Sequence, residues 1–201
     1  MTPGHFKLER VDAIGTGDEL VQFFKEILKP LGYRKYRRAW YLDAPETVVI
    51  VDLQRSSWSE SYTLNLGALV KAIDDGERAY GGPRPNIVDC HIRYTLDELF
   101  PEPPKRPARI TPERARVHSV LDIEFTGTTN DPRQRAAELK KIVDERLLPF
   151  LELYKTEAGI RIIVFDVLGF WNLGGWQLKE RLGIPEEFSS STRVRRKRAR
   201  D

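Results

Sequence analysis

Two nine-residue segments, residues 47–55 and 61–69, constrain the fold of this chain more than any other feature. Each alternates its side chains with the period of a β-strand, and the Ser-rich stretch SSWSES connects them. Facing residues of an antiparallel pair share one face of the sheet. The apolar residues therefore meet only if facing residue numbers sum to an odd value. The opposite face then carries Asp52, Gln54, Thr63 and Asn65.

The polar face of this predicted hairpin also has an apolar end. Val48 and Ile50 share the face of Asp52, so the face changes from apolar to polar along the strand. A pocket with apolar walls and a few polar groups has this pattern. A loop packed over one end of the sheet accounts for it equally well, and the sequence leaves both interpretations open.

Helices are predicted before and after the sheet segments. Residues 17–31 carry apolar side chains at helical spacing, and Thr16 with Glu19 has the spacing of a capping box. Residues 131–154 form the second predicted helix, with Asp131 as its N-cap. Both helices have an apolar stripe that must be buried against another element.

Three further segments are predicted as strands, namely residues 33–42, 87–96 and 117–125. In the second of them, alternation places Cys90 on the apolar face and His91 on the polar face. Residues 160–168 fit either a buried strand or a short helix.

These elements predict an α+β fold, an antiparallel sheet of about four or five strands with an N-terminal helix and a C-terminal helical layer. We expect a single domain over residues 1–188 and a basic, disordered tail over residues 189–201.

The charge of the chain is concentrated at its C-terminus. The last nine residues hold six basic side chains and one acidic side chain, so their net charge is 6 − 1 = +5. The net charge of the whole chain is +3, so residues 1–192 carry 3 − 5 = −2. A folded domain that binds nucleic acid usually has a basic face. The near-neutral net charge of residues 1–192 therefore weakens the interpretation that the folded part binds nucleic acid. The tail itself could bind a polyanion weakly through its basic side chains, which include Arg195, Arg196, Lys197 and Arg198.

Cysteine content and the N-terminus bear on the compartment. Cys90 is the only cysteine, so an intramolecular disulfide is excluded, and we expect a buried structural thiol. No signal-peptide pattern and no apolar run long enough to cross a bilayer is present, so a cytoplasmic protein without membrane contact is the default expectation.

Four short motifs follow one another along the chain. They are the helix end and turn at Lys29–Tyr33, the basic-aromatic strand at Arg37–Tyr41, the strand end Gln54–Ser56 and the strand Asn65–Gly67. Together they resemble the bacterial family called domain of unknown function 4304. The resemblance covers roughly residues 17–100. It implies a small bacterial α+β protein and implies no activity, cofactor or catalytic residue.

The polar sheet face is the first candidate site. A histidine beside a carboxylate suits general acid–base catalysis, and His91 with Asp89 or Asp52 is the first candidate pair. With His118 as a second histidine, the same face could hold a metal ion. An antiparallel sheet with one wet face produces this pattern without any chemistry. We therefore assign no catalytic residue or metal ligand and expect no cofactor. The ligand-binding candidates are Gln54, Arg55, Asn65 and Trp58.

The stretch YRKYRRAWY, residues 33–41, is the second candidate site. Aromatic rings that stack on bases, together with cations that hold phosphates, are typical of single-strand nucleic-acid binding. Its basic residues are Arg34, Lys35, Arg37 and Arg38. Charges on an edge strand, which prevent edge-to-edge pairing, explain the same residues.

No phosphate loop, dinucleotide fingerprint, nucleophile elbow or zinc-protease motif is present, which favours a non-enzymatic protein. Our leading hypothesis is an interaction module whose partner is another protein, with an immunity-type inhibitor as one form and Trp58 as a contact anchor. The alternatives are a small hydrolase or ligand-binding domain on the polar face, and weak, non-specific nucleic-acid binding through the tail.

Overall fold

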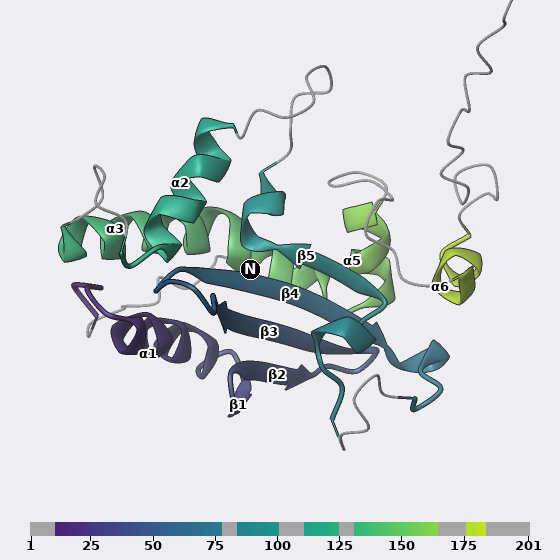
Figure 1. The fold of residues 1–201 in the computed structure, drawn as a ribbon. Coiled ribbons are helices and arrows are strands. Elements are labelled where there is room, and N and C mark those ends of the chain that lie inside the picture. Colours follow the sequence, from purple (N-terminus) through teal and green to yellow (C-terminus); the bar gives the residue numbers. More distant parts are fainter. Residues whose placement is uncertain (1–10, 78–83, 101–110, 125–130, 165–175, 184–201) are drawn as a thin grey trace, which may run out of the picture.

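The computed structural model describes residues 11–77, 84–100, 111–124, 131–164 and 176–183. It is an α+β fold built on a five-stranded antiparallel sheet in the order β1-β2-β3-β4-β5, so the strands lie side by side in chain order (Figure 1). The strands are β1 (Arg34–Tyr36), β2 (Ala39–Asp43), β3 (Thr47–Arg55), β4 (Tyr62–Val70) and β5 (Ile92–Thr95). The helices are α1 (Gly17–Leu28), α2 (Pro112–Leu121), α3 (Pro132–Ile142), α4 (Leu148–Leu153), α5 (Glu157–Ile162) and α6 (Trp176–Arg181). In the described part of the chain, no helix has the length and apolar character needed to span a membrane.

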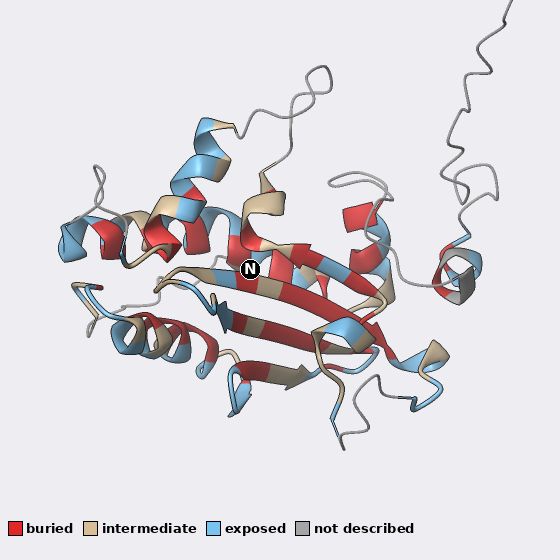
Figure 2. Ribbon diagram, in the orientation of Figure 1, coloured by how far each residue is buried: buried red, intermediate tan, exposed pale blue. Residues whose placement is uncertain are grey.

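The register of β3 and β4 confirms the parity prediction. Asp52 faces Asn65 and Gln54 faces Thr63, so these four polar residues share one face of the sheet. The other face, here called the inner face, carries Val49, Val51, Leu53, Leu64, Leu66, Ala68 and Val70. Figure 2 shows the central parts of these two strands as mostly buried.

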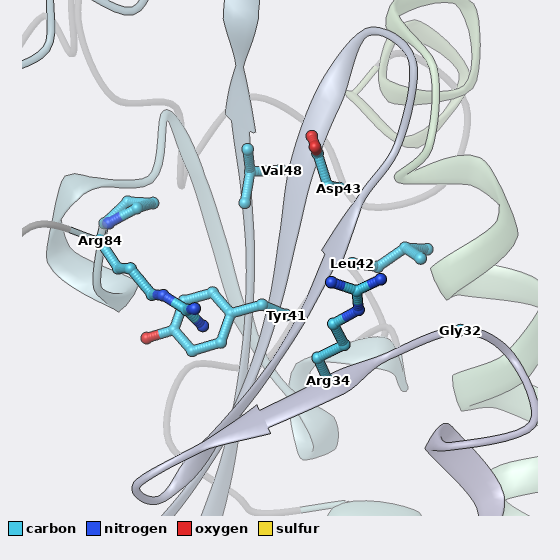
Figure 3. Close-up of a pocket in the computed structure, with 8 residues that line it drawn as sticks. Gly32, Arg34, Tyr41, Leu42, Asp43, Val48 and Arg84 are labelled. Carbon is cyan, nitrogen blue, oxygen red and sulfur yellow. The ribbon is translucent and has the colours of Figure 1, made fainter.

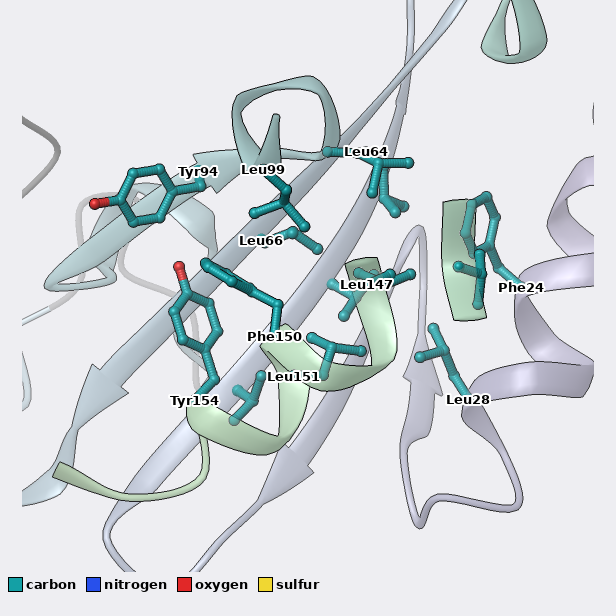
Figure 4. Packing of buried hydrophobic residues seen from close by; sticks show 14 of the residues in the cluster. Phe24, Leu28, Leu64, Leu66, Tyr94, Leu99, Leu147, Phe150, Leu151 and Tyr154 are labelled. Atoms are coloured by element: carbon teal, nitrogen blue, oxygen red, sulfur yellow. The ribbon is translucent and has the colours of Figure 1, made fainter. Parts of the chain in front are cut away.

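The main core lies between the inner face and the helices (Figure 4). Phe24 of α1 and Leu66 of β4 are fully buried there. The ring of Phe150 of α4 packs at a tilt against that of Tyr154, with a centroid distance of 4.6 Å. The Tyr154 backbone oxygen accepts a hydrogen bond from the Thr47 hydroxyl at 2.7 Å. The N-terminal helix and the C-terminal helical layer thus cover the same face of the sheet, which leaves the opposite face to other segments.

Both predicted long helices begin where their caps indicate. Thr16 and Glu19 form the capping box of α1, and the Asp131 carboxylate accepts from the Arg133 N–H at 3.0 Å at the start of α3. The second helix is not continuous, because a π-helical segment, η4 (Val143–Leu147), separates α3 from α4. Pro149 has no backbone N–H, so it cannot donate the hydrogen bond that a regular helix makes to the carbonyl four residues earlier. The π-helical segment lies where this bond is missing.

The prediction of one strand over residues 33–42 was wrong. The segment is a hairpin in which Arg37 and Arg38 form a tight turn between β1 and β2. Arg37 has a φ of 55°, a left-handed conformation that Gly or Asn usually signals. The reversal is stabilised because Trp40 is buried on the inner face, with only 1% of its surface exposed.

The prediction of a strand over residues 87–96 was right only for its second half. A 3₁₀ turn, η2 (Ile87–Asp89), precedes β5, and Asn86 caps it by accepting from the Val88 N–H. The Asp89 carboxylate in turn accepts a hydrogen bond from the Asn86 N–H at 2.7 Å. Local side-chain hydrogen bonds of this kind compete with a strand. Cys90 is buried as expected, but the prediction that it lies on the apolar inner face was wrong.

Residues 117–125 were predicted as a strand, and residues 117–121 instead belong to α2. Thr111 caps this helix by accepting from the Arg114 N–H, and a proline occupies its first turn. Val117 and Leu121 fit helical spacing as well as alternation, so periodicity in this short run was ambiguous. The described part of residues 160–168 is helical up to Val164. The predicted boundary at residue 188 and the basic tail lie outside the described residues.

Candidate functional site

The candidate site lies on the sheet face opposite the main core, here called the outer face. Strand register assigns to it Arg34, Tyr36, Ala39, Tyr41, Asp43, Val48, Ile50, Asp52, Gln54, Thr63, Asn65, Gly67, Leu69, Arg93 and Thr95. A small second cluster covers its centre, where Ile87 and Cys90 pack against Ala39 and Ile50. The η2 turn is therefore the loop that covers the apolar part of this face.

Gly67 makes this cover possible. A Cβ atom at this position would lie 2.5 Å from the Cys90 sulfur and 2.7 Å from the Ile87 Cδ1 atom, closer than van der Waals contact allows. We expect Gly67→Ala to lower the free energy of unfolding by about 1–3 kcal/mol, because the η2 turn must move away from the sheet. Urea unfolding followed by circular dichroism measures this loss.

The reaction of Cys90 with a thiol reagent provides an independent measure, since lifting η2 exposes the sulfur. The control is Cys90→Ala, which removes the atom nearest to the added methyl group. The double variant should lose less stability than the two single variants together. Additive losses and an unreactive thiol in Gly67→Ala would show that η2 does not rest on Gly67.

Asp52 and Asn65 form the polar end of the outer face. The Asn65 side-chain N–H donates to the Gln54 carbonyl at 3.2 Å. Partial burial raises the pKa of Asp52, while a hydrogen bond from Asn65 and the positive charge of Arg38 act in the opposite direction. Of the predicted ligand-binding residues, Gln54 and Asn65 are thus brought together.

The other two ligand-binding candidates lie at the β3–β4 connection. Arg55 forms an ion pair with Glu60 at 3.0 Å. Trp58 is 95% exposed, so it does not fold back onto the sheet. The turn at Arg37–Arg38 lies at the same end of the sheet, because the Leu53 N–H, close to this connection, donates to the Arg38 carbonyl.

Of the three catalytic candidates, His91 and Asp52 are not brought into one site. His91 accepts the Val70 N–H at its Nδ1 atom, at 2.9 Å, and Asp89 caps η2. Asp52 faces Asn65, which is five residues from Val70 along β4, or about 16 Å at roughly 3.3 Å per residue.

The second histidine lies in a different layer. His118 is on α2, with its Nε2 atom 3.5 Å from a carboxylate oxygen of Asp97. Among the described residues, no three His, Cys, Asp or Glu side chains form a group that could hold a metal ion.

Five cations form what is here called the basic corner, and they are Arg34, Lys35, Arg37, Arg38 and Arg84. All five are exposed, and within the described residues none lies within 4.0 Å of a carboxylate oxygen. Arg84 lies 4.8 Å from the ring centroid of Tyr36 and 5.9 Å from that of Tyr41. The four residues from the basic-aromatic stretch are thus joined by a fifth, while the basic residues of the tail lie outside the described residues.

A pocket of about 540 Å³ adjoins the basic corner (Figure 3). Its lining consists of Gly32, Arg34, Tyr41, Leu42, Asp43, Val48, Arg84 and Pro85. The Tyr41 ring lies between the two arginines, because Arg34 is its cross-strand partner and Arg84 lies near its ring. Asp43 forms an ion pair with Lys71 at 2.5 Å.

Sequence reasoning missed this pocket. Arg84 follows a Gly-Pro stretch that predicts only a loop, and no periodic pattern connects it with Tyr41. The available signal was that Tyr41 and Asp43 share a face with Val48, at the apolar end of the outer face. Of the two interpretations left open by the sequence, the covering loop is η2. The pocket shares Val48 with the predicted boundary but is lined by neither Ile50 nor Asp52.

The fold and the pocket define a small α+β protein with a sheet of sequential strands and a cation-lined cavity on its outer face. The model of the family described as Domain of unknown function (DUF4304) matches residues 24–153, more than half of the chain. The chain therefore belongs to this family. No curated protein and no solved structure matched the chain.

Proposed function

We propose that this chain is a non-enzymatic interaction module that binds an acidic surface of a protein partner through its basic corner. The observation that carries the proposal is the concentration of five exposed cations without a carboxylate within 4.0 Å among the described residues. An uncompensated patch of one sign steers a partner of the opposite sign and selects against other partners. An immunity-type inhibitor, which blocks another protein by direct contact, is one form of such a module.

Trp58 supports a protein partner. Its side chain is almost fully exposed beside the sheet end that carries Arg37 and Arg38. Tryptophan and arginine are enriched among the residues that carry most of the binding energy in protein interfaces. An aromatic anchor next to two exposed arginines thus has the composition of the centre of such an interface.

A protein partner is favoured over a nucleic acid by an acidic group on the same face. Asp52 lies on the outer face with the arginines. A phosphate backbone offers this carboxylate only negative charge, whereas an acidic protein surface can place a lysine or arginine opposite it. The hydrolase alternative is weaker in one of its two forms, because His91 and Asp52 lie far apart along the sheet.

The test is affinity capture from an extract of the native host, with the full chain immobilised. The variant Arg37→Glu/Arg38→Glu reverses two cations of the basic corner. The matched control, Arg133→Glu/Lys140→Glu, makes the same change in charge on α3, with its two substitutions at opposite ends of the helix dipole. We expect one protein to be retained stoichiometrically by the wild type and the control, and on the order of tenfold less by the corner variant.

Two results would contradict the proposal. Equal retention by the corner variant and the control would show that the basic corner does not bind the partner. Retention that disappears on nuclease treatment would assign the corner to nucleic acid instead. Circular dichroism of each variant confirms that the fold is retained.

A further inference from the structure

We infer that the pocket beside the basic corner is a binding site for a small molecule that carries a phosphate group on a flat ring. This inference goes beyond the proposed protein contact and does not depend on it. It rests on the size of the cavity, on two arginines that flank it and on the aromatic ring between them.

The size of the cavity suits a small ligand. Its volume of about 540 Å³ lies within the usual range for such sites, roughly 300–1,000 Å³. The walls come from elements fixed by the sheet, since Tyr41, Asp43 and Val48 are paired in the β2–β3 register. Gly32 closes one side with a φ of 90°, a conformation that side-chain-bearing residues rarely adopt.

The charge in the pocket favours a phosphate. Arg34 and Arg84 each offer a planar fork of N–H donors, and two such groups match a phosphate that carries about −1.5 to −2. The one carboxylate of the lining, on Asp43, is already paired with Lys71 at 2.5 Å. The lining therefore keeps a net positive charge near the two guanidinium groups.

The pocket also offers an aromatic and apolar surface on which the ring of the ligand can pack. Tyr41 is half-buried, and Val48 and Leu42 add apolar contact beside it. Flat rings stack on tyrosine rings and on guanidinium planes, and Arg84 already lies 5.9 Å from the Tyr41 centroid. Burial raises the pKa of Tyr41, the charge of Asp52 adds to this effect, and the charge of Arg84 acts against it.

The experiment is isothermal titration of the full chain with two phosphate-bearing ring compounds, phenyl phosphate and adenosine 5′-monophosphate. Adenosine and inorganic phosphate serve as the ring alone and the phosphate alone. We expect at least one ring phosphate to saturate a single site with a Kd below about 1 mM. Its affinity should exceed that of either part by at least about tenfold, because each part makes only half of the contacts.

Substitutions locate the binding. Arg34→Gln and Arg84→Gln should each weaken it by about tenfold, since each removes one charged partner of the phosphate. Arg93→Gln is the matched control, because Arg93 is also exposed on the outer face and does not line the pocket. The variant Arg37→Glu/Arg38→Glu should keep ligand binding while it loses the protein partner, so the two proposals can fail separately.

Three results would overturn the inference. The first is no saturable binding of either ring phosphate up to about 10 mM. The second is affinity that is unchanged in both Arg34→Gln and Arg84→Gln. The third is adenosine binding as tightly as its monophosphate, which would remove the phosphate from the recognised chemistry.

Discussion

Replacing Trp40 with alanine is expected to lower the free energy of unfolding by about 3–5 kcal/mol, the range typical of a buried aromatic residue. Trp40 is 1% exposed, and its ring centroid lies 6.3 Å from that of Phe24 of α1. Lys35, its cross-strand partner, lies 5.4 Å from the ring. The substitution thus opens a cavity between β2 and α1, and urea unfolding followed by far-ultraviolet circular dichroism measures the loss.

The matched variant for this position is Trp40→Phe. The indole N–H is buried and has no hydrogen-bond partner within the described residues. Phenylalanine keeps most of the ring contact and removes that unsatisfied donor, so its cost should stay below about 1.5 kcal/mol. If both variants cost the same, the stabilisation does not come from ring packing in this core.

Replacing Arg135 with alanine is expected to cost about 2–4 kcal/mol, because two backbone carbonyl groups lose their charged donor. The guanidinium of Arg135, only 2% exposed, donates to the Ile14 carbonyl at 2.8 Å and to the Asp122 carbonyl at 3.4 Å. It thus joins the segment before α1 to α3 and to the end of α2. Burial lowers the pKa of Arg135, and the nearby charge of Asp122 partly restores it.

The measurement for Arg135 combines stability with local opening. Hydrogen exchange at the Ile14 amide, which donates to the Pro132 carbonyl at 2.8 Å, should speed up in Arg135→Ala by more than the global loss predicts. The control is Arg133→Ala on the exposed side of the same helix, with an expected change within about 0.5 kcal/mol. A similar loss in both variants would indicate an effect of helix propensity and not of the buried contact.

Local patterns predicted the parts of the fold that local interactions decide. The capping box of Thr16 and Glu19 and the strand parity around Asp52 and Asn65 depend on residues close in sequence or on strict alternation. The turn at Arg37–Arg38 carries no glycine or asparagine, so its left-handed residue gave no signal. In residues 117–121, strand and helix spacing coincide, and the choice of helix depends on the Thr111 cap and on packing.

The candidate site was only partly predictable for a related reason. Gln54 and Asn65 meet because strand register alone places them together. His91 lies outside the predicted strand because the Asn86 cap holds residues 87–89 in the η2 turn, so β5 begins only at Ile92. Arg84 reaches Tyr41 only through the tertiary path of the loop before η2, and no spacing in the sequence encodes that path.

The strand order of the sheet also sets the sequence of events in folding. Neighbouring strands from β1 to β4 are joined by connections of only a few residues, and short hairpins close on a timescale of about 1–10 μs. The contacts of the helical layer connect distant parts of the chain, since Thr47 and Tyr154 are 107 residues apart and Ile14 and Arg135 are 121 apart. Closing such long loops costs more entropy, which places these contacts late on the folding path. We therefore expect the Arg135 contact mainly to slow unfolding and the hairpin around Trp40 to form early.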